Sequence, residues 1–418
     1  MHCKLSERGR RILFSALMTA LVCGIVIEGE LEYPGKITLF EGEQLPIRSA
    51  SAYSIDAPAG IGGVLNDDGT LTSDSYGQYI HLSESGNYEM TVKLFGVIPV
   101  RSVTVDVKPQ PQLAACGNTV GIKIFTKGLV CVGTQEIKSD TGYGRDLSRE
   151  ADIRCGDIFM QANGAELNDT EELSKIVEES QGNPIEFVLL RDGQELCKTV
   201  APLQTADGFK LGIWLRDSTA GIGTLTFYVP ETKSFGALGH PITDGDTGTL
   251  MPVADGTLLR AGVFSVKKGE KGEPGELKGV FKSSEPILGT IAANTEQGIV
   301  GKLQDTSCAS RLYPAASRSQ VREGAATILS NISGETVEEF SIEIQKANRL
   351  FGNEQKDMVI HITDPILLEK TGGIVQGMSG SPIVQDEAIV GAVTHVFVND
   401  PTRGYGIYIE NMLANLPE

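Results

Sequence analysis

Close to the C-terminus the chain reads GIVQGMSGSPIV, from Gly373 to Val384, and this stretch constrains the fold more than any other. Apolar and β-branched residues flank a short segment of glycine and serine, which predicts a strand, a tight turn and a second strand. The sequence PIVQDEAIVGAVTHVF continues the pattern as a strand, a turn and a further strand. Glycine is abundant, with 49 residues, and aromatic residues make up only 6%. We therefore expect a mainly β, turn-rich protein rather than a helical bundle.

The serine within this turn, Ser379, lies between Gly377 and Gly380. A serine hydroxyl becomes a good nucleophile only when a base takes its proton and N–H donors stabilise the oxyanion. A glycine two residues earlier lets its own N–H face a substrate carbonyl, and a glycine directly after permits a strained turn that exposes the hydroxyl. The pattern resembles the G-x-S-G-x-P signature of chymotrypsin-like serine peptidases. In that resemblance Thr394 begins the strand that pairs with substrate, whereas the competing interpretation is an ordinary Gly/Ser-rich hairpin.

A general base is also required, and the chain has five histidines. His2 precedes an apolar N-terminal segment and His81 lies in a region without other reactive residues, so neither is a good candidate. His240 lies in a glycine-rich loop, in the sequence ALGHPI, and ranks first. His395 directly follows Thr394 and ranks second, and His361, within the strand-like MVIHITDP, ranks third.

The acid that would orient the base is harder to assign. Chymotrypsin-like enzymes place His, Asp and Ser in this order, with the Asp well before the Ser. Asp305 has the more usual spacing and Asp364 is closer to the serine, so the residues alone leave both open. Ser381 offers a second hydroxyl, but Pro382 follows it directly and disfavours it as the nucleophile.

The N-terminus has a basic flank, MHCKLSERGRR, followed by sixteen uncharged and mostly apolar residues at 12–27. This pattern indicates a signal sequence or a short membrane anchor, with the N-terminus inside and the remainder exported. No small-x-small cleavage site closes the apolar run, which favours a retained anchor over a removed signal. A buried core helix is the competing interpretation.

Three regions follow this anchor segment at 1–29. Residues 30–108 alternate polar and apolar and predict a small β-rich spacer domain, with a hairpin turn at Gly96–Pro99. After a proline-punctuated linker, residues 109–204 form the next region, and residues 205–418 contain the reactive motifs.

The sequence ADIRCGDIFMQANGAELNDTEEL within 109–204 resembles a PDZ domain, an α+β fold. Asn163-Gly164 predicts a type I′ hairpin turn after a strand at Ile158–Ala162. A helix of roughly Thr170–Ser180 should follow, capped by Asp169 or Thr170. A PDZ domain binds a peptide C-terminus beside a strand and holds the carboxylate with backbone amides. The resemblance assigns this peptide-binding role to six residues: Gly121, Ile122, Ile124, Leu173, Ile176 and Val177. The last three share one helix face, so a place in the core is an equal alternative for them.

Charge and cysteine usage exclude other classes of function. A net charge of −18 argues against nucleic acid as a partner, because phosphate binding needs clustered Lys and Arg. The seven cysteines show no C-x-x-C pair or Cys/His cluster, so we expect no metal and no cofactor. We expect buried free thiols, with one disulfide within the region from Cys116 to Cys197 as the alternative.

The whole arrangement of anchor, β spacer, PDZ-like region and the motifs ALGHPI, ITDP and GGIVQGMSGSPI resembles the stage IV sporulation protein B (SpoIVB) peptidases of endospore-forming bacteria. The resemblance implies a chymotrypsin-like double β-barrel and a triad of His240 as base, Asp364 as orienting acid and Ser379 as nucleophile. The N–H groups of Gly377 and Ser379 would form the oxyanion hole.

The resemblance also implies where and on what the protein acts. Family members work in the space between the forespore and mother-cell membranes, tethered to a membrane. They cleave themselves in trans and a membrane-bound regulator of an intramembrane protease, which leads to activation of a sigma factor. Two alternatives are a quality-control protease, which would place the peptidase before the PDZ domain, and a PDZ scaffold with a decayed peptidase fold.

Overall fold

The computed structural model describes residues 35–41, 44–47, 53–56, 72–74, 77–81, 85–94, 97–140, 142–282, 284–308, 311–347 and 356–417. The predicted anchor and residues His2, Cys3 and Cys23 lie outside these ranges. None of the helices in the described ranges has the length and apolar character needed to cross a membrane. Strands dominate the described residues, which confirms the mainly β prediction.

The chain divides into two units, and the first contains residues 1–111, 315–321 and 348–353. Its described residues form two sheets, and the larger has the strand order β1-β7-β6-β3: β1 Lys36–Phe40, β7 Ile98–Lys108, β6 Gly86–Leu94 and β3 Tyr53–Asp56. The shorter sheet has the order β2-β5-β4: β2 Gln44–Ile47, β5 Gly77–His81 and β4 Thr72–Asp74. β6 and β7 pair antiparallel, and Leu94 lies opposite Ile98, so the last two residues of the turn predicted at Gly96–Pro99 belong to β7. The described part of the spacer region is therefore β-structured, as expected.

The second unit contains residues 112–314, 322–347 and 354–418. Its N-terminal part is a ring of six strands, each hydrogen-bonded to the next in the order β9-β20-β22-β23-β19-β18, with β18 returning to pair with β9. The bounds are β9 Thr119–Thr134, β20 Val253–Lys267, β22 Gly289–Thr295, β23 Gly298–Leu303, β19 Ser234–Ala237 and β18 Ile213–Tyr228. Three further strands border this ring: β8 Gln112–Ala115, β24 Arg311–Pro314 and β21 Glu276–Phe281. The ring encloses an apolar core that includes Ile124, Phe235 and Leu258.

The C-terminal part of the second unit is a closed barrel with the order β25-β26-β27-β30-β29-β28. Its strands are β25 Gly324–Ser330, β26 Glu338–Ala347, β27 Met358–Ile362, β30 Asp400–Tyr408, β29 Ala388–Phe397 and β28 Pro382–Gln385. The strands predicted after the serine turn are present as β28 and β29. A short helix, α4 (Pro365–Thr371), precedes the turn in place of a strand. Helix α5 (Ile409–Leu413) follows the last strand.

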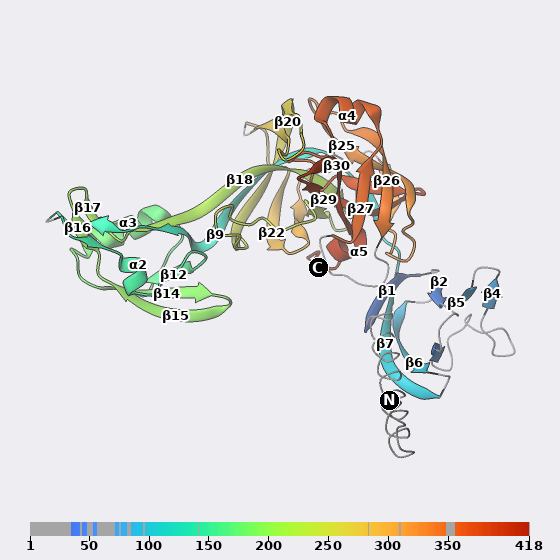
Figure 1. Ribbon diagram of the computed structural model, residues 1–418, viewed down its shortest axis with the longest axis horizontal. Coiled ribbons are helices and arrows are strands. Elements are labelled where there is room, and N and C mark those ends of the chain that lie inside the picture. The colour runs from blue at the N-terminus through green and yellow to red at the C-terminus, as the bar shows by residue number, and fades with distance from the viewer. Residues whose placement is uncertain are drawn as a thin grey trace, which may run out of the picture. The chain divides into compact units, whose positions relative to one another are not determined.

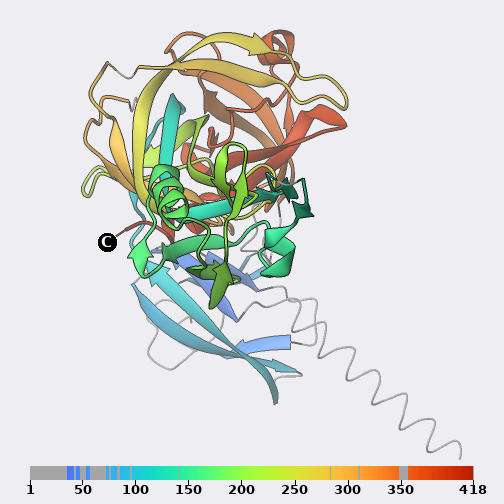
Figure 2. The same cartoon turned by 90° about the vertical axis from the view of Figure 1, so that its left-hand side faces the viewer.

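A smaller group of elements lies between β9 and β18 in the sequence, and we call it the α+β lobe. It contains the far ends of β9 and β18 with ten shorter elements: β10 Ile137–Lys138, β11 Gly144–Arg145, α2 Leu147–Glu150, β12 Ile158–Ala162, β13 Ala165–Glu166, α3 Thr170–Glu179, β14 Ile185–Arg191, β15 Gln194–Val200, β16 Leu203–Thr205 and β17 Gly208–Lys210. In Figure 1, β9 and β18 run together from this lobe to the ring, in agreement with their long antiparallel pairing. Figure 2 faces the lobe, with α3 in green.

The local predictions in the lobe are confirmed. β12 has the predicted bounds, and the turn residues Asn163 and Gly164 have φ of 49° and 79°, as a type I′ turn requires. α3 begins after Asp169, whose side chain accepts a hydrogen bond from the N–H of Glu172. The capped helix packs its apolar face into the lobe core against residues such as Phe159 and Phe187.

The peptide-binding role predicted for Gly121, Ile122 and Ile124 is wrong. These residues lie in the middle of β9 and pair with β18 on one side and with β20 on the other. A strand with neighbours on both edges has no free backbone amides for a peptide carboxylate, and Ile122 and Ile124 are buried in the ring core. The pairing also places residues 112–126 with the ring, although these residues were expected to belong to the PDZ-like region at 109–204.

Candidate active site

The serine turn joins α4 to β28 and has the backbone that its glycines predicted. Gly377 and Gly380 have φ of 98° and 96°, a region that side chains with a Cβ rarely adopt. A Cβ at Gly380 would lie 2.2 Å from the carbonyl oxygen of Thr224 and 2.6 Å from the nitrogen of Leu238. Only glycine therefore lets the turn approach β18 and the segment that leads to His240.

Thr224, on β18, fixes the orientation of the turn. Its hydroxyl donates to the carbonyl of Gly377 at 2.7 Å, and its backbone N–H donates to the carbonyl of Ser379 at 3.0 Å. With both carbonyls held by β18, the N–H groups of Gly377 and Ser379 have no hydrogen-bond partner within the described ranges. Two unpartnered N–H groups in one turn are what an oxyanion hole requires. Sequence reasoning missed Thr224, because a buried threonine in a strand has no distinguishing pattern.

The Ser379 hydroxyl donates to the carbonyl oxygen of Thr394 at 2.6 Å. Thr394 lies on β29 and is buried, whereas Ser379 is partly exposed. The residue expected at the start of the substrate strand therefore lies next to the expected nucleophile.

The two highest-ranked histidines lie together beside this turn. The ring centroids of His240 and His395 are 4.9 Å apart, and a Cβ on the neighbouring Gly239 would lie 3.0 Å from Cγ2 of Thr394. The Nδ1 of His240 is 2.8 Å from the carbonyl oxygen of Pro241, so the neutral ring is held with its proton on Nδ1 and Nε2 free to accept one. His395 has a buried Nδ1 with no hydrogen-bond partner in the described part of the chain. His361 lies in β27, opposite Arg403.

Burial shifts both histidines toward the neutral form. It lowers the pKa of His240 below the ordinary 6.5, against an opposing effect of the Pro241 carbonyl. Burial, followed by the charges of His240 and Lys356, lowers the pKa of His395 to about 4. A neutral imidazole at physiological pH is the form that serves as a general base.

Neither candidate acid is hydrogen-bonded to a histidine in the described structure. The carboxylate of Asp364 caps α4 by accepting the N–H groups of Ile366 and Leu367 at 2.9 and 3.0 Å, and it also accepts the N–H of Ser341. Asp305 accepts the N–H of Ser307 and forms an ion pair with Arg260. The Ser307 backbone and hydroxyl donors and then the Arg260 guanidinium lower the pKa of Asp305 to about 2. The structure thus brings together Ser379, His240, His395 and Thr394, but gives Asp364 other partners.

Ser381, the alternative nucleophile, is fully buried and donates to the hydroxyl of Ser330 at 3.0 Å. A buried hydroxyl that already has a partner is not available to a substrate. Ser379 is therefore the better-placed hydroxyl of the two.

In the α+β lobe, the three helix residues predicted to bind peptide face inward. Leu173 and Val177 are buried in the lobe core, and Ile176 is partly buried against it. Of the two interpretations left open for these residues, the core position is the one observed for Leu173 and Val177.

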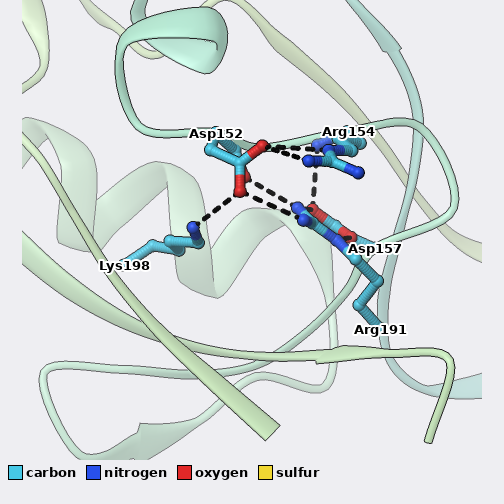
Figure 3. A network of polar contacts seen from close by, with 5 residues as sticks. All are labelled: Asp152, Arg154, Asp157, Arg191 and Lys198. Atoms are coloured by element: carbon cyan, nitrogen blue, oxygen red, sulfur yellow. Dashed lines mark hydrogen bonds and ion pairs between the residues drawn. The ribbon is translucent and has the colours of Figure 1, made fainter. Parts of the chain in front are cut away.

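An ion-pair network braces the segment that precedes β12 (Figure 3). Asp157, whose side chain is only 1% exposed, accepts hydrogen bonds from Arg191 at 2.6 and 2.7 Å. Asp152, which is half exposed, contacts Lys198, Arg154 and Arg191, and these donors lower the pKa of its carboxyl. The network ties the loop before β12 to β14 and β15.

The cysteines of the described residues are all free: Cys116, Cys131, Cys155, Cys197 and Cys308. This result confirms free thiols over a disulfide, although Cys155 and Cys197 are exposed rather than buried. The described residues also contain no group of three His, Cys, Asp or Glu side chains that could hold a metal ion.

Comparison with known proteins adds one finding. Residues 207–413 match the family model described as SpoIVB peptidase S55. The matched range runs from the end of the α+β lobe to α5 and includes Ser379, His240 and Asp364. A search of curated proteins found no match.

Proposed function

The chain belongs to the SpoIVB peptidase S55 family and is a serine peptidase; we propose that it is an endopeptidase that performs limited, signalling proteolysis at a membrane surface. The nucleophile is Ser379 and the general base is His240. The N–H groups of Gly377 and Ser379 stabilise the oxyanion. The observation that carries this assignment is the serine turn: Thr224 binds the carbonyls of Gly377 and Ser379, while the N–H groups of these two residues have no partner among the described residues.

The hydrogen bond from Ser379 to Thr394 supports a role for substrate in activating the site. The pairing of β29 with β28 ends at Ala392, and a substrate strand that adds beside the following residues of β29 needs the Thr394 carbonyl as an acceptor. Its N–H displaces the Ser379 hydroxyl, which is then free to turn toward Nε2 of His240. His240 takes the hydroxyl proton as the oxygen attacks the scissile carbonyl, and it later returns the proton to the leaving amine.

The family resemblance adds Asp364 as the group that orients His240. In this role its carboxylate would replace the Pro241 carbonyl as the acceptor of the His240 Nδ1–H, and it would have to give up part of its capping of α4. The orienting role of Asp364 therefore stays a prediction. Substitutions at Asp364 can distinguish this role from its role as the cap of α4.

A serine-reactive fluorophosphonate probe tests the assignment. Wild-type protein should be labelled at Ser379, and Ser379→Ala and His240→Ala should not be labelled. Ser381→Ala is the matched control, since it removes a hydroxyl two residues away and should keep the labelling. Labelling that survives Ser379→Ala would disprove the assignment, and an unlabelled but folded wild-type protein would favour a scaffold with a decayed site.

The wider role proposed here rests on the resemblance of the chain to the family. It comprises a retained N-terminal anchor, an exported peptidase in the space between the forespore and mother-cell membranes, self-cleavage in trans and cleavage of a membrane-bound regulator that leads to sigma factor activation. Expression of Ser379→Ala in a sporulating host tests this role. We expect a block in processing of that regulator, and normal processing would refute it.

We further propose that the α+β lobe binds peptide termini, as a PDZ domain does. Its confirmed hairpin and capped helix support this proposal, with an occupant that is either a substrate or the chain itself. Binding of peptides with free and amidated C-termini, measured by fluorescence polarisation, provides the test. A PDZ-like site prefers the free carboxylate, and equal binding would count against it.

A further inference from the structure

The segment 241–251, which we call the His240 loop, directly follows the proposed base and leads to β20. The first anchor of this loop is on the ring. The side chain of Asn294, on β22, accepts the N–H of Ile242 at 2.9 Å and donates to the carbonyls of Ile242 at 2.7 Å and Met251 at 3.0 Å. Both ends of the loop are thereby held against the ring.

The middle of the loop is organised around the carboxylate of Asp244, whose side chain is 0% exposed. One of its oxygens accepts the N–H groups of Asp246 and Thr247 at 3.1 and 3.0 Å and the Thr247 hydroxyl at 3.0 Å. The other oxygen pairs with the guanidinium of Arg216, which also lies 3.4 Å from Asp246. A buried carboxylate is tolerated only when it is paired and hydrogen-bonded, so the loop conformation depends on Arg216.

Arg216 belongs to the lobe rather than to the loop. It lies on β18 opposite Val130 of β9, and Val130 in turn lies opposite Ile158 of β12. Val130 and Ile158 also form a small apolar cluster with two loop residues, Met251 and the partly buried Ile242. The His240 loop therefore has a second anchor, one ion pair and one apolar cluster, on the α+β lobe.

We propose that Arg216 is a positioning residue for His240 and acts through Asp244, so that the α+β lobe sets the place of the general base. The proposal rests on the function proposed above for His240. Without the guanidinium, Asp244 is left as a buried, unpaired charge, and the loop opens until the carboxylate reaches water. The base then spends less time within reach of Ser379, which lowers kcat, whereas substrate binding to β29 is unaffected.

The next residue on β18 extends this link to the helix of the lobe. The carboxylate of Asp217 accepts the backbone N–H and the hydroxyl of Thr170, the first residue of α3, at 3.2 and 3.1 Å. Arg216 and Asp217 thus connect α3 and the His240 loop to adjacent positions of one strand. Both contacts therefore belong to the strand that carries Arg216.

The test compares three variants of the full chain. Arg216→Gln removes the charge, Arg216→Lys keeps it, and Arg145→Gln removes an arginine that pairs with Glu150 on the surface of the same lobe. We expect Arg216→Gln to lower kcat roughly 10-fold or more with KM within about 2-fold, since small misplacements of a catalytic group have effects of this size. Backbone hydrogen exchange should rise in 241–251 and stay unchanged in β29 and β30. Arg216→Lys should recover much of kcat, and Arg145→Gln should match wild type.

Two results would overturn the proposal. Unchanged exchange of 241–251 in Arg216→Gln would show that Arg216 does not anchor the loop. Raised exchange with unchanged kcat would show that the anchor has no bearing on the base. A wild-type protein that fails to react with the phosphonate probe contradicts the proposed function instead, and the exchange measurement still reports on the anchor because it needs no activity.

Discussion

At the scale of single residues, the candidate site depends on which backbone groups of the serine turn are hydrogen-bonded within the protein and which are available to a substrate. Thr224 binds the carbonyls of Gly377 and Ser379, and the N–H groups of these same two residues have no hydrogen-bond partner within the described ranges. The first prediction concerns this arrangement. Thr224→Val keeps the shape of the side chain but loses the hydroxyl donor to Gly377, so the turn can rotate. We expect kcat/KM to fall about 10- to 100-fold.

The matched control is Thr224→Ser, which retains the hydroxyl and should keep most of the activity. Steady-state cleavage of a peptide substrate measures both variants. Equal activity of the valine and serine variants would show that the backbone N–H of Thr224 alone is enough to hold the turn.

The second prediction concerns pH. His240 must be neutral to act as a base, and burial lowers its pKa below 6.5. Activity should therefore persist below pH 6.5. The midpoint of the acid limb of the kcat/KM profile should lie below 6.5, the ordinary pKa of histidine. A midpoint at or above 6.5 would contradict the buried environment of the ring.

The lowered pKa values of His240 and His395 also affect the stability of the folded protein. Because the unfolded chain binds protons on His240 and His395 at higher pH than the folded protein does, the free energy of unfolding falls as pH drops below 6.5. For His395 the loss should be complete only near its folded pKa of about 4. Denaturant unfolding between pH 7 and pH 4 provides the measurement.

The third prediction separates the two roles of Asp364. Asparagine caps helices about as well as aspartate, whereas alanine does not, and loss of a cap costs about 1 kcal/mol. If Asp364 orients His240, Asp364→Asn keeps the wild-type stability but loses kcat by orders of magnitude. We expect this result on the family assignment, and an active Asp364→Asn with an unstable Asp364→Ala would assign the residue to the α4 cap alone.

At the scale of elements, local sequence signals were reliable where the chemistry is local. The Asn163-Gly164 turn, strand β12 and the Asp169 cap of α3 were all predictable, because positive φ and capping depend on the residues themselves. The pairing partners of the strands, in contrast, could not be predicted from local sequence. Val120–Ile124 has the pattern of a short strand, but nothing within it indicates that its neighbours are β18 and β20, about 100 and 130 residues further along the chain.

The ion-pair network of Figure 3 gives the prediction at this scale. Arg191→Met leaves Asp157 buried without a cation, which typically costs about 3 kcal/mol. Arg145→Gln, at an exposed pair, should leave the free energy of unfolding close to that of wild type. Urea unfolding monitored in the lobe measures the free energy of unfolding of both variants. Equal decreases would mean that the buried Arg191–Asp157 pair contributes no more to stability than the exposed Arg145–Glu150 pair.

At the scale of the whole molecule, the reactive motifs indicated a peptidase, but the order of motifs along the chain suggested separate domains in sequence. The structure instead inserts the α+β lobe between two strands of one ring. The family match begins at residue 207 and so omits β8 and β9, although β9 pairs with both β18 and β20. A pattern in sequence cannot reveal such an insertion, because the two halves of the ring are separated by the lobe.

The last prediction follows from this pairing. A fragment of residues 205–418 lacks β9 and leaves the edges of β18 and β20 exposed, so it should aggregate. A fragment of residues 112–418 retains every strand of the ring and should give a cooperative thermal transition. Circular dichroism and size-exclusion chromatography distinguish them, and a monomeric, folded 205–418 fragment would contradict the six-stranded ring.

The double connection of the lobe has a mechanical consequence. A module on a single linker turns freely about it, but one that leaves and re-enters through two hydrogen-bonded strands can bend without swivelling. Ligand recognition at the far end of β18 would then reach Thr224, and with it the oxyanion-binding amides, as strain along one continuous backbone.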